Sequence, residues 1–560
     1  MKNLTFVLLI IVISFQGSSK SFPAADLILV NGKILTMDSR NPVTSSIVIV
    51  GNKIQFTGDD AGSLKFRDKN SKVIDLQGKT VIPGLHDAHL HFEGGSDLIS
   101  DRLSLRFLNK EQILKKIEDA VKASPEGALI RAYSYNHAYF KDKKFPDKYD
   151  LDKVAPKNPV IITRVDGHSI WVNSMTLKMA GISKETPDPQ GGELIRFKDN
   201  NPTGILKENA EMMVGKVTGP RMVVLGSSGE NKLLNAIRFA NKLGLTSVTT
   251  QGSLKLMKQL NEIDKTGELT LRFNLWISPA EMKRCVEKGI NFRSGSDKVR
   301  ISFVKIFADG SLGSVSAAFF KPYTNNPKTS GILIHPIEEL DKLISDAHKN
   351  GFQAGVHAIG NRGVHLVLNA VEKAQQKFGM KGLRHRIEHT QFITDEDLLR
   401  FNKLKMIPSM QPTHCTTDLL VVEERIGKER AKQGYRWNSF KKEGVMLAFG
   451  TDWPVEPLDP RRGLYSSIER KNIENGFPEN GWFPGEQISI TDAIRYYTLG
   501  AAYASFNEKR IGSIESGKLA DLTIFDADLE KIIEKDKKNM LKVKIYKTIM
   551  DGKIVNILKK

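Results

Sequence analysis

The segment VIPGLHDAHLHF (81–92) is an apolar run that ends in closely spaced histidines. Residues two apart on a β-strand project from the same face, so His89 and His91 are expected to lie side by side. Paired imidazoles suit zinc or a similar divalent ion. Two unrelated histidines on one strand would give the same pattern, so the pair needs support from other side chains. His86 faces the other way by the same alternation and is not expected to be a ligand.

Strand-like and helix-like segments alternate through the middle of the chain, which is typical of an α/β protein. Eight segments have the apolar, β-branched character of buried strands. They are Thr80–His91, Leu245–Gln251, Leu271–Ile277, Val299–Asp309, Phe352–Ala358, Leu383–Thr390, Lys405–Pro412 and Val445–Trp453. Eight such units predict a (β/α)8 barrel of the TIM type.

Both ends of the chain contain short strand-like segments separated by Gly and Asn, which predicts one small β-sandwich domain built from both termini. We assign residues 20–80 and 505–560 to this domain and residues 81–504 to the barrel. The first two barrel strands are too far apart for one connecting helix. An insertion at about 92–240 is therefore expected over the barrel mouth, where it would shape a substrate pocket.

Residues 1–19 have the pattern of a signal peptide. A short basic start precedes the apolar run Leu4–Phe15, and the small residues Gly17–Ser19 follow it. The run is too short to span a bilayer. We therefore expect an exported protein, periplasmic or secreted, without an integral membrane span after removal of the signal.

The chain has 560 residues with a formal net charge of +19. Its lysines are scattered through stretches of mixed sign, and no nucleic-acid-binding motif is present. The charge is therefore interpreted as a basic solvated surface. We expect a small-molecule substrate and no nucleic-acid partner.

Metal-capable side chains recur where later predicted strands end. Lys305 lies in the apolar run FVKIF (303–307), while His357, His389 and Asp452 each close a strand-like segment. Barrel enzymes carry their catalytic groups at the carboxyl-terminal ends of the strands. A free ammonium in such a run is costly, so Lys305 needs a partner or a modification. Together these residues predict a metal centre.

With these motifs the sequence resembles the metal-dependent amidohydrolase superfamily, in the branch called amidohydrolase family 3, the YtcJ-like group. The resemblance extends over essentially the whole mature chain. The matching segments are VIPGLHDAHLHF (81–92), RVDGHSIWVNS (164–174), FVKIFADGSLGS (303–314), GVHAIGN (355–361), HRIEHTQ (385–391), QPTHCTTD (411–418), FGTDWPVEPLDP (449–460) and GSIESGKLADLTIFD (512–526). Relatives hydrolyse C–N bonds of amides and related compounds, including N-substituted formamides.

The resemblance implies a set of metal ligands at His89, His91, Lys305, His357, His389 and Asp452. Lys305 would be carboxylated and would bridge two divalent ions, with zinc the first expectation and a one-metal site left open. Asp452 would accept a proton from the metal-activated water and deliver it to the leaving amine. Relatives often form dimers, so a homodimer is also left open.

Four further residues are candidates for contact with the substrate. Asp166, His168 and Trp171 lie in the segment RVDGHSIWVNS, where a capped turn before a helix would explain them equally well. His414 follows the seventh predicted strand.

The function we expect is metal-dependent hydrolysis of a non-peptide or amide C–N bond. A deaminase-type amidohydrolase is the first alternative, because ring and exocyclic C–N bonds are cleaved at similar metal sites. A non-catalytic binding or regulatory protein of the same fold is the second, although it would have no need for a complete ligand set. Loops and the insertion are expected to form the pocket walls and so to select the substrate.

Overall fold

The computed structural model describes residues 23–100, 105–217, 222–224 and 232–558. The predicted signal peptide, residues 1–19, lies outside them. None of the helices described there combines the length and the apolar character that crossing a bilayer requires.

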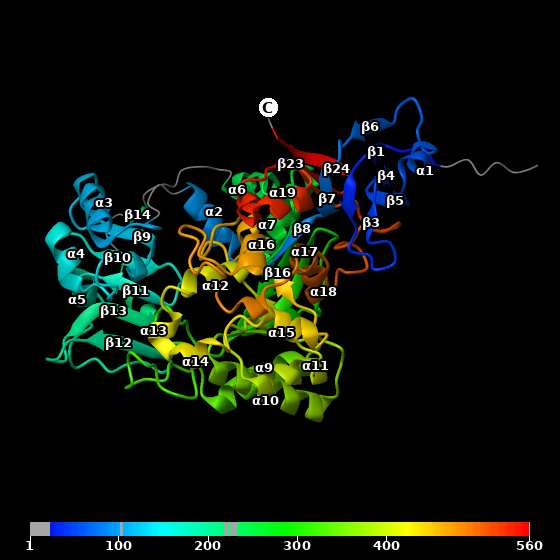
Figure 1. Ribbon diagram of the computed structural model, residues 1–560. Coiled ribbons are helices and arrows are strands. Elements are labelled where there is room, and N and C mark those ends of the chain that lie inside the picture. The colour runs from blue at the N-terminus through cyan, green and yellow to red at the C-terminus, as the bar shows by residue number, and fades with distance from the viewer. Residues whose placement is uncertain (1–22, 101–104, 218–221, 225–231, 559–560) are drawn as a thin grey trace, which may run out of the picture.

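The centre of the molecule is a barrel of eight parallel strands, as expected (Figure 1). In sheet order they are β21 (Ala448–Phe449), β20 (Ile407–Met410), β19 (Arg386–His389), β18 (Ala354–Ala358), β17 (Val299–Phe307), β16 (Arg272–Ile277), β15 (Leu245–Gln251) and β8 (Leu85–Leu90). Neighbours in the sheet are neighbours in the sequence, except that the insertion separates β8 from β15. The strands are almost entirely buried, as a parallel sheet covered by helices requires.

Backbone hydrogen bonds between β8 and the segment after β21 bring the two edges of the barrel sheet together. The Asp452 N–H donates to the His89 carbonyl at 2.7 Å, and the His91 N–H donates to the Trp453 carbonyl at 2.6 Å. A Cβ at Gly450 would lie 2.6 Å from the His89 backbone nitrogen, so only glycine fits there. This closure places Asp452 directly beside His89 and His91.

The first predicted barrel strand is in fact two strands. β7 (Thr80–Pro83) pairs with β22 (Leu522–Phe525) outside the barrel, whereas β8 pairs with β15 inside it. Gly84 separates them, and a Cβ there would lie 2.1 Å from the Thr246 hydroxyl. The apolar run is continuous in sequence, but this close approach marks the point where the chain passes from one sheet to another.

The two chain ends build a β-sandwich, as expected. One sheet has the order β5 (Lys53–Gly58), β4 (Ser46–Val50), β1 (Leu27–Val30) and β6 (Lys72–Asp75). The other has the order β24 (Lys553–Ile557), β23 (Ile545–Met550), β22, β7, β2 (Lys33–Leu35) and β3 (Val43–Thr44). Alternate residues such as Leu29, Ile49 and Ile524 form the apolar core shared by N- and C-terminal strands.

The insertion after β8 contains a sheet of its own, drawn on the opposite side of the barrel from β1–β6 in Figure 1. Its order is β12 (Gly192–Arg196), β13 (Pro202–Glu208), β11 (Ser169–Val172), β10 (Val160–Arg164), β9 (Leu129–Tyr135) and β14 (Met222–Val224). The helices α3 (Lys110–Lys122), α4 (Lys148–Val154) and α5 (Ser174–Met179) accompany it.

Helices connect the barrel strands. They include α2 (Phe92–Ser100), α6 (Lys232–Lys242), α7 (Leu254–Lys265), α8 (Pro279–Glu287), α9 (Ile337–Lys349), α10 (Asn361–Phe378), α11 (Asp395–Lys403), α12 (Pro412–Asp418), α13 (Val422–Ile426), α14 (Lys428–Ala431), α15 (Trp437–Lys442) and α16 (Pro460–Glu469). Local signals set their limits. Thr394, for example, caps α11 by accepting from the Asp397 N–H.

Candidate metal centre

Metal-capable side chains converge at the carboxyl-terminal ends of the barrel strands. His89 is near the end of β8 and His91 follows it, while Asp452 lies three residues beyond β21. These three offer ligand atoms within 4.8 Å of one another, and so does a second group of His389, His414 and Asp452. Asp452 belongs to both groups and joins them into one cluster.

Asp452 makes close approaches to several imidazoles. Its Oδ1 lies 3.3 Å from His91 Nε2 and 3.6 Å from His89 Nε2, and its Oδ2 lies 3.7 Å from His414 Nε2. Burial alone would raise the pKa of Asp452, but the close approach of His91 and the other nearby histidines outweighs burial and lowers it. The carboxylate is therefore ionised at neutral pH.

Hydrogen bonds orient two of the histidines for metal binding. His89 Nδ1 lies 2.7 Å from Glu388 Oε2, and His389 Nδ1 lies 2.8 Å from the Gln411 carbonyl oxygen. Each acceptor fixes the proton on Nδ1 and leaves the lone pair of Nε2 available. Burial and Lys305 lower the pKa of His89 to about 4, which keeps the ring in the neutral form that binds metals.

Two buried atoms of the cluster show that the residues fit a metal ion. Asp452 Oδ1 and His414 Nε2 have no hydrogen-bond partner. A buried polar atom without a partner is costly and calls for an explanation, such as an ion. The donor set of imidazole nitrogens with a carboxylate oxygen is one that zinc accepts.

His414 becomes a ligand only if the Gln391 amide is rotated. As placed, Gln391 Nε2 donates to His414 Nδ1 at 3.1 Å, which leaves the proton of His414 on Nε2. Gln391 Oε1 has no partner in this orientation. Turning the amide by about 180° lets Oε1 accept from Nδ1–H and frees Nε2. The geometry thus offers His414 both as a ligand and as a donor toward Asp452.

Lys305 and His357 lie beside the two groups rather than in them. Lys305 Nζ is 3.3 Å from His89 Nε2, and burial lowers the pKa of Lys305 to about 8. Among the described residues, no carboxylate lies within 4.0 Å of this Nζ. His357 lies 4.5 Å from His389 between ring centroids, and its Nε2 is 3.2 Å from the Gly310 carbonyl. Because the His357 Nε2–H donates to this carbonyl, the lone pair of His357 is on Nδ1 and is free.

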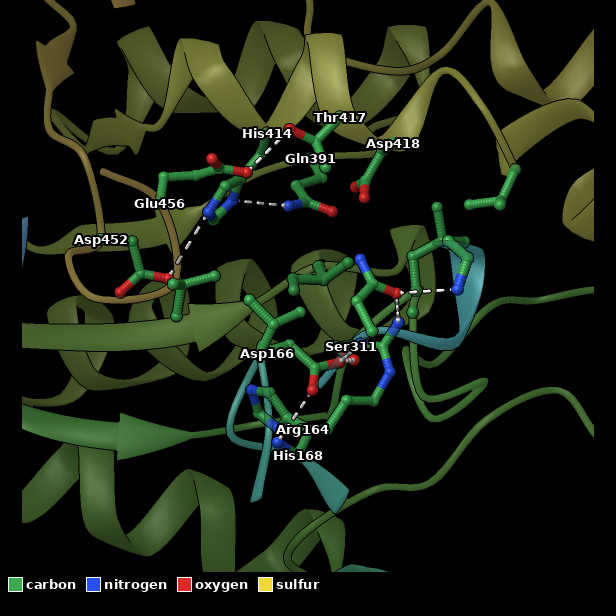
Figure 2. Close-up of a pocket in the computed structure, with 18 of the residues that line it drawn as sticks. Arg164, Asp166, His168, Ser311, Gln391, His414, Thr417, Asp418, Asp452 and Glu456 are labelled. Atoms are coloured by element: carbon green, nitrogen blue, oxygen red, sulfur yellow. Dashed lines mark hydrogen bonds and ion pairs between the residues drawn. The ribbon is translucent and has the colours of Figure 1, made fainter. Parts of the chain in front are cut away.

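A second polar cluster comes from the insertion and faces the first across a cavity (Figure 2). Asp166 accepts from Ser311 and from Ser314 at 2.9 Å, and it forms an ion pair with Arg164 at 2.5 Å. His168 Nδ1 lies 2.8 Å from Glu208 Oε2. Burial lowers the pKa of His168, but Glu208 outweighs this and raises it to about 9.

The structure places Asp166, His168 and His414 on the cavity wall, but not Trp171. Trp171 is fully buried in the core of the insertion beside Tyr135, and its indole N–H donates to the Asp147 carbonyl. Adjacent strand residues face opposite sides of a sheet, and the side chain of Trp171 is on the side that forms the apolar core of the insertion. The expectation that Trp171 contacts the substrate is therefore corrected.

Two important residues were missed from the sequence. Glu388 and Arg386 are buried in the barrel, where Arg386 donates to both carboxylate oxygens of Glu388. Burial would raise the pKa of Glu388, but Arg386 and His89 lower it to about 2. The available signal was the alternation Arg386-Ile-Glu388, which puts both charges on one face of a buried strand.

The cavity has the size of a small-molecule site. One of its lobes has a volume of about 470 Å³ and is lined by His91, Lys305, His168 and Asp452, among others. A connected lobe reaches from Asp452 and His414 to residues of the insertion and of α12–α13. The insertion and the barrel therefore enclose the site together.

The fold and the cluster define the class of protein. It is an α/β barrel whose strand ends bring metal-capable side chains together at an enclosed polar cavity. The sequence profile of the amidohydrolase family matches residues 72–556, and the chain belongs to this family. This confirms the resemblance seen in the sequence.

Similarity to individual proteins supports the same family assignment. The chain is 31% identical to YtcJ of Bacillus subtilis over 535 residues, covering 94% of this chain and 98% of that protein. It is 25% identical to the N-substituted formamide deformylase of Arthrobacter pascens, covering 90% and 94%. Among solved structures, a metal-dependent hydrolase of Pyrococcus furiosus described as uncharacterized has a TM-score of 0.66 at 28% identity, covering 89% of this chain and 98% of that one.

Proposed function

We propose that this protein is an exported, metal-dependent amidohydrolase that cleaves a non-peptide C–N bond of a small amide. One observation carries the proposal: His89, His91, His389 and His414 surround Asp452, whose buried Oδ1 has no hydrogen-bond partner. Such a cluster at the mouth of a barrel suits hydrolysis by an activated water.

The metal is proposed to be zinc, one or two ions per chain. His89, His91, His357, His389 and Asp452 would hold it, with Lys305 as a carboxylated ligand. When bound, the metal supplies Lewis-acid polarisation of the scissile carbonyl and lowers the pKa of water toward neutrality.

Asp452 is proposed as the residue that moves the proton. It is ionised and buried, so it can accept a proton from the attacking water and return it to the departing nitrogen. Glu388 holds His89 with Nε2 toward the cluster, and the insertion residues Asp166 and His168 enclose the substrate and limit access of bulk water.

Carboxylation of Lys305 is proposed on the basis of its environment. Burial favours the neutral amine, and only the neutral amine attacks CO2. The neutral amine forms one N–C bond as one C=O π bond of CO2 breaks, and Nζ then releases one proton. With the earlier loss of the ammonium proton, two protons leave and a buried cation becomes an anion. An anionic oxygen beside His89 suits a divalent ion better than an ammonium does.

The bond type and the location rest on sequence. A C–N bond is favoured because a relative that aligns with 90% of this chain is named as a formamide deformylase. Export is favoured by the apolar run Leu4–Phe15 behind a basic start. Sequencing the amino terminus of the mature protein tests export, and cleavage near Ser19 is the expected result.

The decisive experiment combines elemental analysis with a screen for turnover. The purified protein is expected to contain one or two divalent ions per chain and to release amines from a panel of amides and formamides. Asp452→Asn should retain the fold and lose turnover. Release of ammonia from ring or exocyclic amines, with no amide hydrolysis, would instead establish a deaminase. A folded chain that takes up no metal on reconstitution would refute the catalytic proposal.

A further inference from the structure

The cavity that reaches Asp452 is also lined by Arg425, from helix α13. This arginine is 6% exposed. Among the described residues, no carboxylate oxygen lies within 4.0 Å of its guanidinium, and its Nε makes no hydrogen bond. A buried guanidinium without a counter-charge is unfavourable, because the lost hydration is not replaced.

His137 cannot satisfy the arginines around it. Arg164 Nε lies 3.3 Å from His137 Nδ1, and Arg425 Nη2 lies 3.2 Å from His137 Nε2. A neutral imidazole has one acceptor nitrogen and carries a proton on the other. One of the two arginine N–H groups therefore faces the protonated ring nitrogen of His137 and finds no acceptor there. The array formed by Arg164, His137 and Arg425 has more donors than acceptors.

The acidic residues of the same cavity are already engaged. Asp166 pairs with Arg164, and Glu456 accepts from Thr417 while Arg106 lies 3.9 Å away. Asp418 accepts from the Tyr435 hydroxyl at 2.5 Å, and burial raises the pKa of its carboxyl. Asp418 attracts Arg425 from a distance, but none of these carboxylates lies within 4.0 Å of its guanidinium.

We propose that Arg425 binds a carboxylate carried by the substrate, so that the substrates are small amides that also bear a carboxylate group. The planar guanidinium fork matches a carboxylate in geometry and charge. The bound carboxylate supplies the acceptor oxygens that the array lacks. This inference rests on the proposed function and names the substrate class for the same site.

Turnover of a matched pair of compounds tests this preference. The N-formyl derivatives of 4-aminobutanoate and 4-aminobutanamide have the same size and differ in charge. The wild-type protein should favour the anionic compound in kcat/KM by about 10- to 100-fold, the range expected for charge-assisted hydrogen bonds. Arg425→Met should remove this preference.

Arg430→Met is the matched control. Arg430 lies five residues further along and donates to the Lys321 and Pro322 carbonyls outside the cavity. Its replacement removes the same charge and should leave the preference intact. If Arg425→Met fails to fold, Arg425→Lys keeps the charge but loses the fork, and the preference should fall only in part. An unchanged preference in a folded Arg425 variant would overturn the inference.

A binding measurement separates this inference from the proposed function. Calorimetric titration with glutarate and with glutaramide requires no turnover. Glutarate should bind the wild-type protein at least tenfold more tightly than glutaramide, and Arg425→Met should abolish the difference. Glutarate binding that survives in Arg425→Met but disappears after chelation would assign the carboxylate to the metal and refute the role of Arg425.

Discussion

Two polar clusters face each other across the cavity, and they differ in how well their buried atoms are satisfied. In the barrel cluster, Asp452 Oδ1 and His414 Nε2 have no hydrogen-bond partner. In the insertion cluster, Asp166 accepts hydrogen bonds from Ser311 and Ser314 and pairs with Arg164. Unsatisfied buried atoms mark a place prepared for a ligand, whereas the fully engaged Asp166 carboxylate holds the insertion and the segment after β17 together.

The sharpest test of this contrast is Asp452→Asn. If Asp452 moves the proton, its loss should reduce kcat by about 10³-fold, the middle of the range for general acid–base catalysis. Steady-state kinetics with circular dichroism as a check of folding measures the effect. Less than a tenfold loss in a folded variant would place proton transfer elsewhere.

Metal removal should affect the barrel cluster and spare the insertion cluster. A ligand bound to the native state stabilises it, so chelation is expected to lower the melting temperature of the wild-type protein by several degrees. His89→Ala should show a much smaller response to the same treatment. Equal responses in both proteins would mean that chelation acts at another site.

Asp166→Ala tests the engaged carboxylate of the insertion cluster. Loss of this carboxylate leaves Arg164 buried without its partner and should cost about 3 kcal/mol of stability. Denaturant unfolding measures the loss, and metal content should stay the same. A loss of metal in this variant would show that the two clusters are not independent.

The same carboxylate predicts a pH dependence. Burial would raise the pKa of Asp166, but Arg164, His168 and the two serines lower it below its usual value of 3.8. A lowered pKa contributes stability that is present above pH 3.8 and is lost as the pH falls toward the folded value. The stability difference between the wild-type protein and Asp166→Asn should therefore shrink below about pH 4. A constant difference over that range would contradict the assignment.

The smallest effect is expected for Trp171→Phe. The change removes the hydrogen bond to the Asp147 carbonyl and should cost about 1 kcal/mol. Because Trp171 does not line the cavity, kcat and KM should not change. A raised KM would instead support the expectation from the sequence that Trp171 contacts the substrate.

Sequence patterns predicted the barrel and most of the cluster well. Each barrel strand is a short, apolar, locally recognisable segment, and strand ends in a parallel barrel meet at one rim. His89, His91, His389 and Asp452 could therefore be placed together before any contact was known. The break at Gly84 was missed because the apolar run continues through it, and only its close approach to Thr246 reveals it.

The sequence by itself determined the fold class, the family and which histidines and carboxylates stand at strand ends, because periodicity and strand ends are local properties. Only the tertiary structure decided which polar atoms are satisfied. The pairing of His89 with Glu388 spans 299 residues, and the contact of Arg425 with His137 spans 288. The first pairing depends on how the barrel strands come together and the second on how the insertion packs against the barrel, so the orientation of His89 and the excess of donors at Arg425 leave no local trace.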